Sequence, residues 1–118
     1  MKKVYYLLMV VSVIAFSTDM SHARPERIKA GISYYSEDYT TKDGISDIGD
    51  EKNYEEVFKN YEYYEAVYDE HKRITRFRAY KRGDIVLIEN YSYNDDGKIS
   101  LKQVTDAGGK TTTIKYGK

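Results

Sequence analysis

The pattern of apolar and polar residues divides the chain into three parts. An unbroken apolar run extends from Val4 to Phe16, residues 24–60 show only a weak pattern, and from Tyr61 onward apolar and polar residues alternate. Alternation with a period of two is typical of half-buried strands. We therefore expect a leader over residues 1–23, an N-terminal segment over residues 24–60 that packs on a sheet, and a β-meander of two hairpin repeats over residues 61–118.

The first part has the features of a secretory signal peptide. Lys2 and Lys3 precede the apolar run, and Ser21 and Ala23 put small residues where a signal peptidase cuts. A cut after Ser17 is the alternative cleavage. An uncleaved membrane anchor is disfavoured, because the apolar run is shorter than the ~20 residues that span a bilayer. The sequence predicts a secreted or periplasmic bacterial protein with no membrane span after cleavage.

Turn signals in the third part predict a mainly β, antiparallel fold. The turn clusters are Asp69–Lys72, Arg82-Gly83, Asp95-Asp96-Gly97 and Ala107-Gly108. Four turns separate five strands, and their spacing of ~8–12 residues is typical of an antiparallel meander. The fold class is therefore a β-meander sheet of five or more strands.

The weaker pattern of residues 24–60 predicts fewer elements than the alternation after Tyr61. A strand is expected over residues 32–39, with turns at residues 42–44 and 48–50. Asn53 and Glu56 have the spacing of a capping box, which predicts a short helix near residues 51–58. Tyrosines from Tyr54 to Tyr68 also fall on one helical face, but the sequence YEYYEAVY is β-rich, and we favour a strand over residues 61–68.

Turn lengths predict the strand register. A three-residue loop ending at a left-handed Gly97 sets Tyr93 opposite Ile99, and a two-residue Arg82-Gly83 turn sets Tyr80 opposite Ile85. When the pairing is continued along the strands from these turns, it predicts two apolar rows on opposite faces of the sheet. One row is Val67, Ile74, Tyr91, Leu101 and Ile114, and the other is Tyr64, Phe77, Ile88 and Val104. Both faces then need cover from the N-terminal segment or from a second subunit.

Composition narrows the classes of function. The chain has no cysteine, so disulfides and thiolate sites are excluded. Its 19 basic and 19 acidic residues balance, and removal of the leader leaves a net charge of about −1, which gives no electrostatic case for binding nucleic acid. The 14 tyrosines favour sheet, where a ring packs while its hydroxyl stays hydrated.

An internal repeat underlies a family resemblance. Shifted by 25 residues, Tyr68 aligns with Tyr93, Ile74 with Ile99, Gly83 with Gly108 and Tyr91 with Tyr116. The stretch from Tyr91 through Gly97 to Ile99, followed by Val104 to Lys110 and Tyr116, resembles the tyrosine-aspartate (YD) repeat of Rhs and teneurin proteins, over residues 68–117. His71-Lys72 stands where that pattern has a glycine. The resemblance implies β-sheet; the large shells of that family need many more copies.

One set of side chains is a candidate ligand-binding site. The predicted register places Arg76 between Glu65 and Glu89 on one face, framed by Tyr63 and Tyr91. Such a ladder would bind a polar ligand or shift the pKa of a carboxyl group enough for catalysis. The alternative is a row of cross-strand ion pairs worth a fraction of a kcal/mol each.

Other candidate chemistry is sparse. The acidic turn before Gly97 lacks the ligands of a calcium loop, because Ser92 and Gln103 stand where strong ligands are needed. His71 falls in a turn, and neither hydrolase nor phosphate-binding motifs occur. We therefore expect no metal, no cofactor and no catalytic residue.

The expected function is a non-enzymatic structural or protein-interaction module of the bacterial envelope or exterior. Its expected partners are an envelope protein or a glycan, with no nucleic acid. Two alternatives remain open. One is a glycan- or peptidoglycan-binding module that uses exposed tyrosines, since adjacent pairs such as Tyr34-Tyr35 and Tyr63-Tyr64 point to opposite faces. The other is a small enzyme that uses Glu65, Arg76 and Glu89.

Overall fold

The computed structural model describes residues 27–117. The predicted signal peptide lies outside the described residues. The elements in chain order are β1 (Tyr34–Ser36), β2 (Tyr39–Lys42), β3 (Ile45–Ile48), β4 (Glu51–Lys52), α2 (Tyr54–Val57), β5 (Glu62–Tyr68), β6 (Ile74–Lys81), β7 (Asp84–Tyr93), β8 (Ile99–Asp106) and β9 (Thr111–Lys115). The expectation of a mainly β fold is confirmed.

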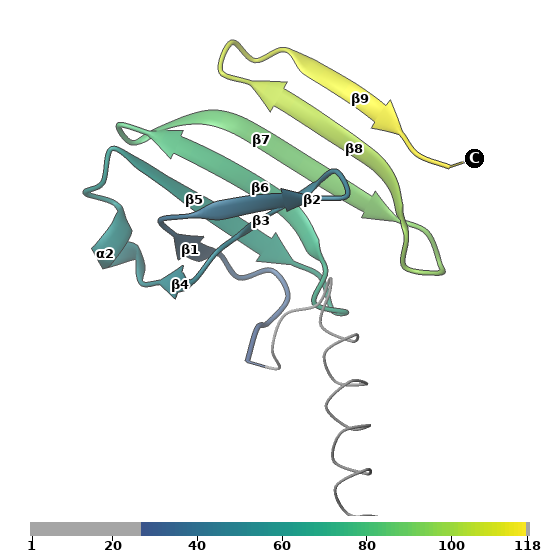
Figure 1. Cartoon of the computed structure of the whole chain (residues 1–118), viewed down its shortest axis with the longest axis horizontal. Helices are drawn as coiled ribbons and strands as arrows, with labels where there is room; N and C mark the ends of the chain where they lie inside the picture. The colour runs from purple at the N-terminus through teal and green to yellow at the C-terminus, as the bar shows by residue number, and fades with distance from the viewer. Residues whose placement is uncertain (1–26, 118) are drawn as a thin grey trace, which may run out of the picture.

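Seven strands form one antiparallel sheet in the order β4-β1-β5-β6-β7-β8-β9, and β2 and β3 form a separate hairpin. Strands β5 to β9 follow one another across the sheet, with β9 at one edge (Figure 1). The five-stranded meander expected from the turn spacing is therefore present. The strand interpretation of YEYYEAVY is confirmed too, because all of these residues except Tyr61 form β5.

The N-terminal part of the described chain does more than pack on this sheet. Strands β1 and β4 extend the sheet beyond β5. The strand expected over residues 32–39 is interrupted, because β1 ends at Ser36, whose hydroxyl accepts the N–H of Asp38 before β2 begins. The short helix is α2, where the backbone N–H of Asn53 donates to the Glu56 carboxylate as the capping box predicts.

Three loops of the meander share one backbone geometry. In each, the residue before a three-residue loop donates its N–H to the carbonyl of the residue after it, as Asn94 does to Lys98. The last loop residue is left-handed in every case: Lys72 (φ 63), Gly97 (φ 87) and Gly109 (φ 88). The bulged loop predicted at Gly97 is confirmed, but the four-residue turn at residues 69–72 and the two-residue turn at residues 107–108 were wrong by one residue each.

β-bulges shift the register further. The two-residue turn at Arg82-Gly83 pairs Tyr80 with Ile85 as predicted, but a bulge between Ala79 and Tyr80 then pairs Ala79 with Leu87. Another irregularity follows the confirmed Tyr93–Ile99 pair, so that Ser92 lies opposite Leu101. A slip of one residue moves a side chain to the other face. The two predicted apolar rows were therefore wrong, because each mixes residues of both faces.

The two faces of the sheet are covered unequally. The β2–β3 hairpin lies over β5 and β6 and crosses in front of the sheet in Figure 1. We call the face beneath it the covered face. It carries the core residues Ala66, Tyr68, Ile74, Phe77 and Tyr91, with Ile28 and Ile48 packed on them. The other face, called the open face, has α2 at one corner, where Tyr54 packs on Tyr35 and Tyr63.

Candidate functional site

The structure divides the predicted binding residues between the two faces. Glu65 lies opposite Arg78, while Arg76 lies opposite Val67 and Asn90, so Arg76 does not stand between two glutamates. Alternation along β5 and β6 puts Tyr63, Glu65 and Arg76 on the open face. Glu89 lies opposite Phe77 and Val104, on the covered face with Tyr91. The trio Glu65, Arg76 and Glu89 therefore does not converge in one site, since the sheet separates its two carboxylates.

Glu65 is the centre of a hydrogen-bond network on the open face. Its side chain is only 5% exposed. Its carboxylate accepts hydrogen bonds from the Ser33 hydroxyl, from the Tyr80 hydroxyl at 2.7 Å and from Arg78 Nη1 at 3.3 Å. Burial, followed by the hydrogen bond donated to Glu65, raises the pKa of Tyr80 to about 12. The network therefore engages both oxygens of the Glu65 carboxylate as hydrogen-bond acceptors.

The arginines of the open face are less completely engaged. Arg78 pairs with Glu65, and the pKa of Arg78 is raised; burial acts against this shift, and hydrogen bonds to Tyr80 and Glu65 outweigh it. Within residues 27–117, the buried Nε atoms of Arg76 and Arg78 have no hydrogen-bond partner. A buried N–H without an acceptor is unfavourable. Each of the two guanidinium groups thus has one N–H buried without an acceptor among the described residues.

Aromatic rings gather next to this network, at the corner where α2 meets β5. We call them the corner cluster: Tyr35, Tyr54, Phe58, Tyr63 and Tyr80. Tyr63 and Tyr80 stack at 4.6 Å between ring centroids, and Tyr54 and Phe58 stack at 5.3 Å. Tyr63 is 4% exposed, whereas Tyr54 is 46% and Phe58 44% exposed. Burial raises the pKa of Tyr63 and of Tyr35. The cluster therefore has a buried base and an exposed outer layer.

The covered face holds a second polar group, which fastens the hairpin to the sheet. The Tyr91 hydroxyl donates to Glu89 and accepts the N–H of Ser46 at 2.8 Å. Lys102 Nζ lies 3.7 Å from Glu89 and donates to the Gly44 carbonyl at 2.8 Å. Burial, then the bond to Glu89, raises the pKa of Tyr91. Because Glu89 and Tyr91 are 7% and 5% exposed, these contacts serve the fold rather than a ligand.

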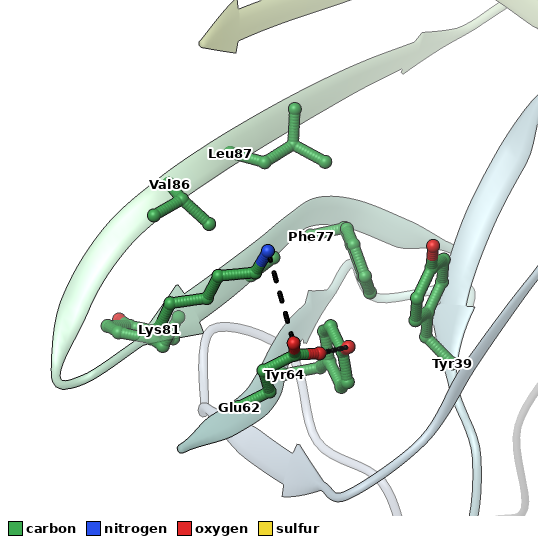
Figure 2. A pocket seen from close by; sticks show the side chains of 9 residues that line it. Tyr39, Glu62, Tyr64, Phe77, Lys81, Val86 and Leu87 are labelled. Carbon is green, nitrogen blue, oxygen red and sulfur yellow. Dashed lines mark hydrogen bonds and ion pairs between the residues drawn. The ribbon is translucent and has the colours of Figure 1, made fainter. Parts of the chain in front are cut away.

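A pocket of about 200 Å³ opens on the covered face beside β2 (Figure 2). Its aromatic wall is formed by Tyr39, Tyr64 and Phe77, with ring centroids of Tyr39 and Tyr64 at 4.7 Å. Glu62 stands at the rim, where it accepts the Tyr64 hydroxyl at 3.0 Å and faces Lys81 Nζ at 3.9 Å. Burial and then the bond to Glu62 raise the pKa of Tyr64 to about 12. Rings with a carboxylate and an ammonium beside them suit a small polar ligand with an apolar face.

Sequence reasoning identified part of these surfaces. It named Tyr63 and Tyr64 among the tyrosines for a binding surface, but it did not bring Phe77, Glu62 and Lys81 to a pocket. Glu62 and Lys81 are cross-strand partners at the end of β5 and β6 that lies farthest from the connecting loop, and the register shift beside Tyr68 separates this pair from the pair at the loop. The corner cluster depends on α2 folding back beside β1, and no local signal fixes that position.

The other residues considered as candidates from the sequence make ordinary turn contacts or lie exposed. Asp96 Oδ1 accepts the N–H of Lys98 in the Gly97 loop, as in an ordinary hairpin turn. His71 is exposed, and its N–H donates to Asp69. In the part of the chain that the structure describes, no three metal-ligating side chains come together. The described helix is too short and too polar to cross a bilayer, and residues 27–117 contain no other candidate for a membrane-spanning helix.

Comparison with known proteins gave no match to a family model, to a curated protein or to a solved structure. The resemblance to YD repeats therefore stays a prediction from the sequence.

Proposed function

We propose that this protein is a non-enzymatic interaction module of the bacterial envelope or exterior, and that it binds a partner protein through the corner of its open face. The observation that carries the proposal is the corner cluster, where the stacked rings of Tyr54 and Phe58 are both more than two-fifths exposed. Large aromatic side chains that are exposed together are common at the centres of protein interfaces.

The surroundings of this corner support a protein partner. Arg76 and Arg78 lie partly exposed on the same face, and arginine is enriched with tyrosine and phenylalanine at interfaces. Tyr61, 56% exposed, lies beneath Arg82, whose guanidinium is 5.5 Å from the ring centroid. A partner with acidic and apolar side chains would contact rings and guanidinium groups together.

The hydrogen bonding and the burial of Glu65 support a binding function over a catalytic one. A general base needs a free lone pair that faces substrate. Glu65 already accepts three side-chain hydrogen bonds and is almost completely buried.

Site-specific photo-crosslinking in the native host tests the proposal. A photoreactive amino acid at Phe58 should give one discrete adduct with an envelope protein, identified by mass spectrometry. The same residue at Thr40, an exposed position on the β2–β3 hairpin, is the matched control and should give none. Tyr54→Ala should reduce the Phe58 adduct several-fold. Equal adducts from both positions, or none from Phe58, would contradict the proposal.

A glycan is the second candidate partner, and the pocket beside β2 favours it. Sugars bind by placing an apolar ring face on an aromatic side chain while charged groups bond their hydroxyls. The rings of Tyr39 and Tyr64, with Glu62 and Lys81 at the rim, offer both kinds of contact.

Titration with soluble peptidoglycan fragments tests this candidate by tyrosine fluorescence, since the chain has no tryptophan. Saturable binding in the millimolar range should be lost in Tyr39→Ala and kept in Tyr61→Ala, which removes an exposed ring elsewhere. Binding that does not saturate, or that survives Tyr39→Ala, would eliminate the pocket as a glycan site.

A further inference from the structure

Among residues 27–117, no strand pairs with the outer edge of β9. In the strand order β9 comes last, and all five of its side chains are exposed. The opposite edge is β4, which is two residues long, carries Glu51 and Lys52, and leads directly into α2. Short, charged edge strands prevent strand addition. By contrast β9 contains no proline, and its pairing with β8 has no bulge.

The β8–β9 register determines which backbone groups of β9 point outward. Asp106 donates its N–H to the Lys110 carbonyl, and Tyr116 donates its N–H to the Ser100 carbonyl. Even-numbered residues of this segment therefore bond to β8. Because backbone groups alternate sides along an antiparallel strand, the N–H and C=O groups of Thr111, Thr113 and Lys115 point away from the sheet.

We propose that β9 pairs with β9 of a second copy of this chain, antiparallel and across a two-fold axis at Thr113. Thr113 then lies opposite Thr113 of the second copy, and Thr111 lies opposite Lys115. All three outward-pointing residues of each strand find a partner, which gives about six backbone hydrogen bonds. A register shifted by two residues would leave one end of each strand unpaired.

Charge and symmetry favour a second copy as the occupant. Lys115 is the one charged residue of β9, and the two-fold register places it opposite a threonine. Lys110 comes opposite Tyr116, where an ammonium beside a ring is favourable. Threonine pairs across strands are favourable too. Two-fold pairing uses the open edge of both copies and leaves the two blocked β4 edges outside, so that the assembly closes as a dimer.

The size of this interface sets its strength. Two five-residue strands bury well under the ~1,600 Å² of a standard interface. We therefore expect a dissociation constant in the micromolar range or weaker, and a dimer population that depends on concentration.

Sedimentation velocity across a concentration series tests the proposal, with protein isolated in the form that the host accumulates. The wild type should pass from monomer to dimer as the concentration rises. Thr113→Lys places two ammonium groups opposite each other and should weaken the dimer at least ten-fold. Thr40→Lys adds the same charge on the hairpin and should behave as the wild type. A wild type that remains monomeric up to millimolar concentration, or equal dimerisation of the two variants, would overturn the proposal.

Single cysteines test the register, and the cysteine-free background makes the test clean. A directly opposed pair at Thr113 puts the two Cα atoms ~5.5 Å apart, within reach of a disulfide. Two copies of position 112 are instead ~8 Å apart, beyond that reach. Thr113→Cys should therefore give a covalent dimer on mild oxidation, and Thr112→Cys should give little. Preferential crosslinking of Thr112→Cys would overturn the register. Crosslinking from Phe58 in the host should persist in Thr113→Lys, so failure of this proposal is distinct from failure of the proposed function.

Discussion

At the scale of residues, three loops of the meander need a left-handed residue at the same position, and they use different residue types there. Gly97 and Gly109 adopt the left-handed conformation at no steric cost, whereas Lys72 adopts it with a side chain. Lys72 Nζ donates to the Ile28 carbonyl at 3.1 Å, which ties the loop to the N-terminal segment. The sequence predicted the loop at Gly97 because glycine marks it. The loop at Lys72 was assigned the wrong length because lysine gives no such signal, and the loop at Gly109 because two adjacent glycines leave its end ambiguous.

A substitution series in the β8–β9 loop checks this account. Gly109→Ala should lower the free energy of unfolding by about 1 kcal/mol, because φ is 88° there and alanine resists that conformation. Gly108→Ala is the control in the same loop, since Gly108 does not have a positive φ and an added Cβ would make only ordinary contact with Asp106. Urea unfolding measures both. Equal losses would contradict the left-handed assignment.

Asp69 makes the β5–β6 loop sensitive to pH. Burial acts to raise the pKa of Asp69, but hydrogen bonds from the N–H groups of Arg73 and His71 and from the Arg73 side chain outweigh it, and the pKa is lowered from its usual 3.8. A lowered folded-state pKa gives stability that is present above pH ~4 and is lost as the pH falls through the folded pKa.

Asp69→Asn keeps an oxygen for the loop N–H groups but removes the charge that faces Arg73 Nε at 3.0 Å. The variant should be less stable than the wild type by roughly 1 kcal/mol at pH 7. The difference should shrink as the pH falls below ~4, because the wild-type carboxylate is then protonated. Unfolding curves from pH 7 to pH 2 measure it, with exposed Asp95→Asn as control. A difference that is constant over this range would refute the linkage.

At the scale of elements, bulges explain why the predicted register failed away from the turns. The pairs next to two turns, Tyr80–Ile85 and Tyr93–Ile99, were predicted from local chemistry. The shorter loop after Asp69 and the register shift beside Tyr68 together bring Arg78 rather than Arg76 opposite Glu65. The shift beside Tyr80 places Glu89 on the other face. Bulges leave little sequence signal, since they arise from sheet twist and packing. The prediction thus named the right types of residue, but it was displaced by two positions between β5 and β6 and by one position between β6 and β7.

The β2–β3 hairpin is held on the sheet by buried polar bonds as well as by rings. Tyr91→Phe should lower the free energy of unfolding by about 1–3 kcal/mol, because Ser46 N–H and the Glu89 carboxylate lose a buried partner. It should also speed hydrogen exchange at Ser46. Tyr39→Phe, which removes an exposed hydroxyl from the same hairpin, should change stability little. If Tyr91→Phe unfolds like Tyr39→Phe, the bonds do not hold the hairpin.

At the scale of the whole molecule, the sequence predicted an antiparallel meander that needs cover, but not how the cover is arranged. Periodicity from Tyr61 onward is local and was sufficient for β5 to β9. The placement of the hairpin over β5 and β6 depends on contacts between residues far apart in sequence, such as Ser46 with Tyr91 and Gly44 with Lys102. The cover ends near β8, and β9 remains exposed. Within the seven-stranded sheet of the described residues, the strand whose side chains are all exposed therefore lies at an edge.

Hydrogen exchange can distinguish two sources of protection in β9. One is its hydrogen bonding to β8, and the other is its pairing with a second copy. In dilute protein the N–H groups of Thr112 and Ile114 should exchange slowly, because they bond to β8, while those of Thr111, Thr113 and Lys115 should exchange fast. As the concentration rises through the dimer range, the three odd-numbered N–H groups should slow and the even-numbered ones should change little. Odd-numbered groups that are already slow in dilute protein would mean that another part of the same chain covers this edge. An alternating pattern that appears with concentration is specific to strand pairing, because association through a face of the sheet would leave the exchange of the β9 edge unchanged.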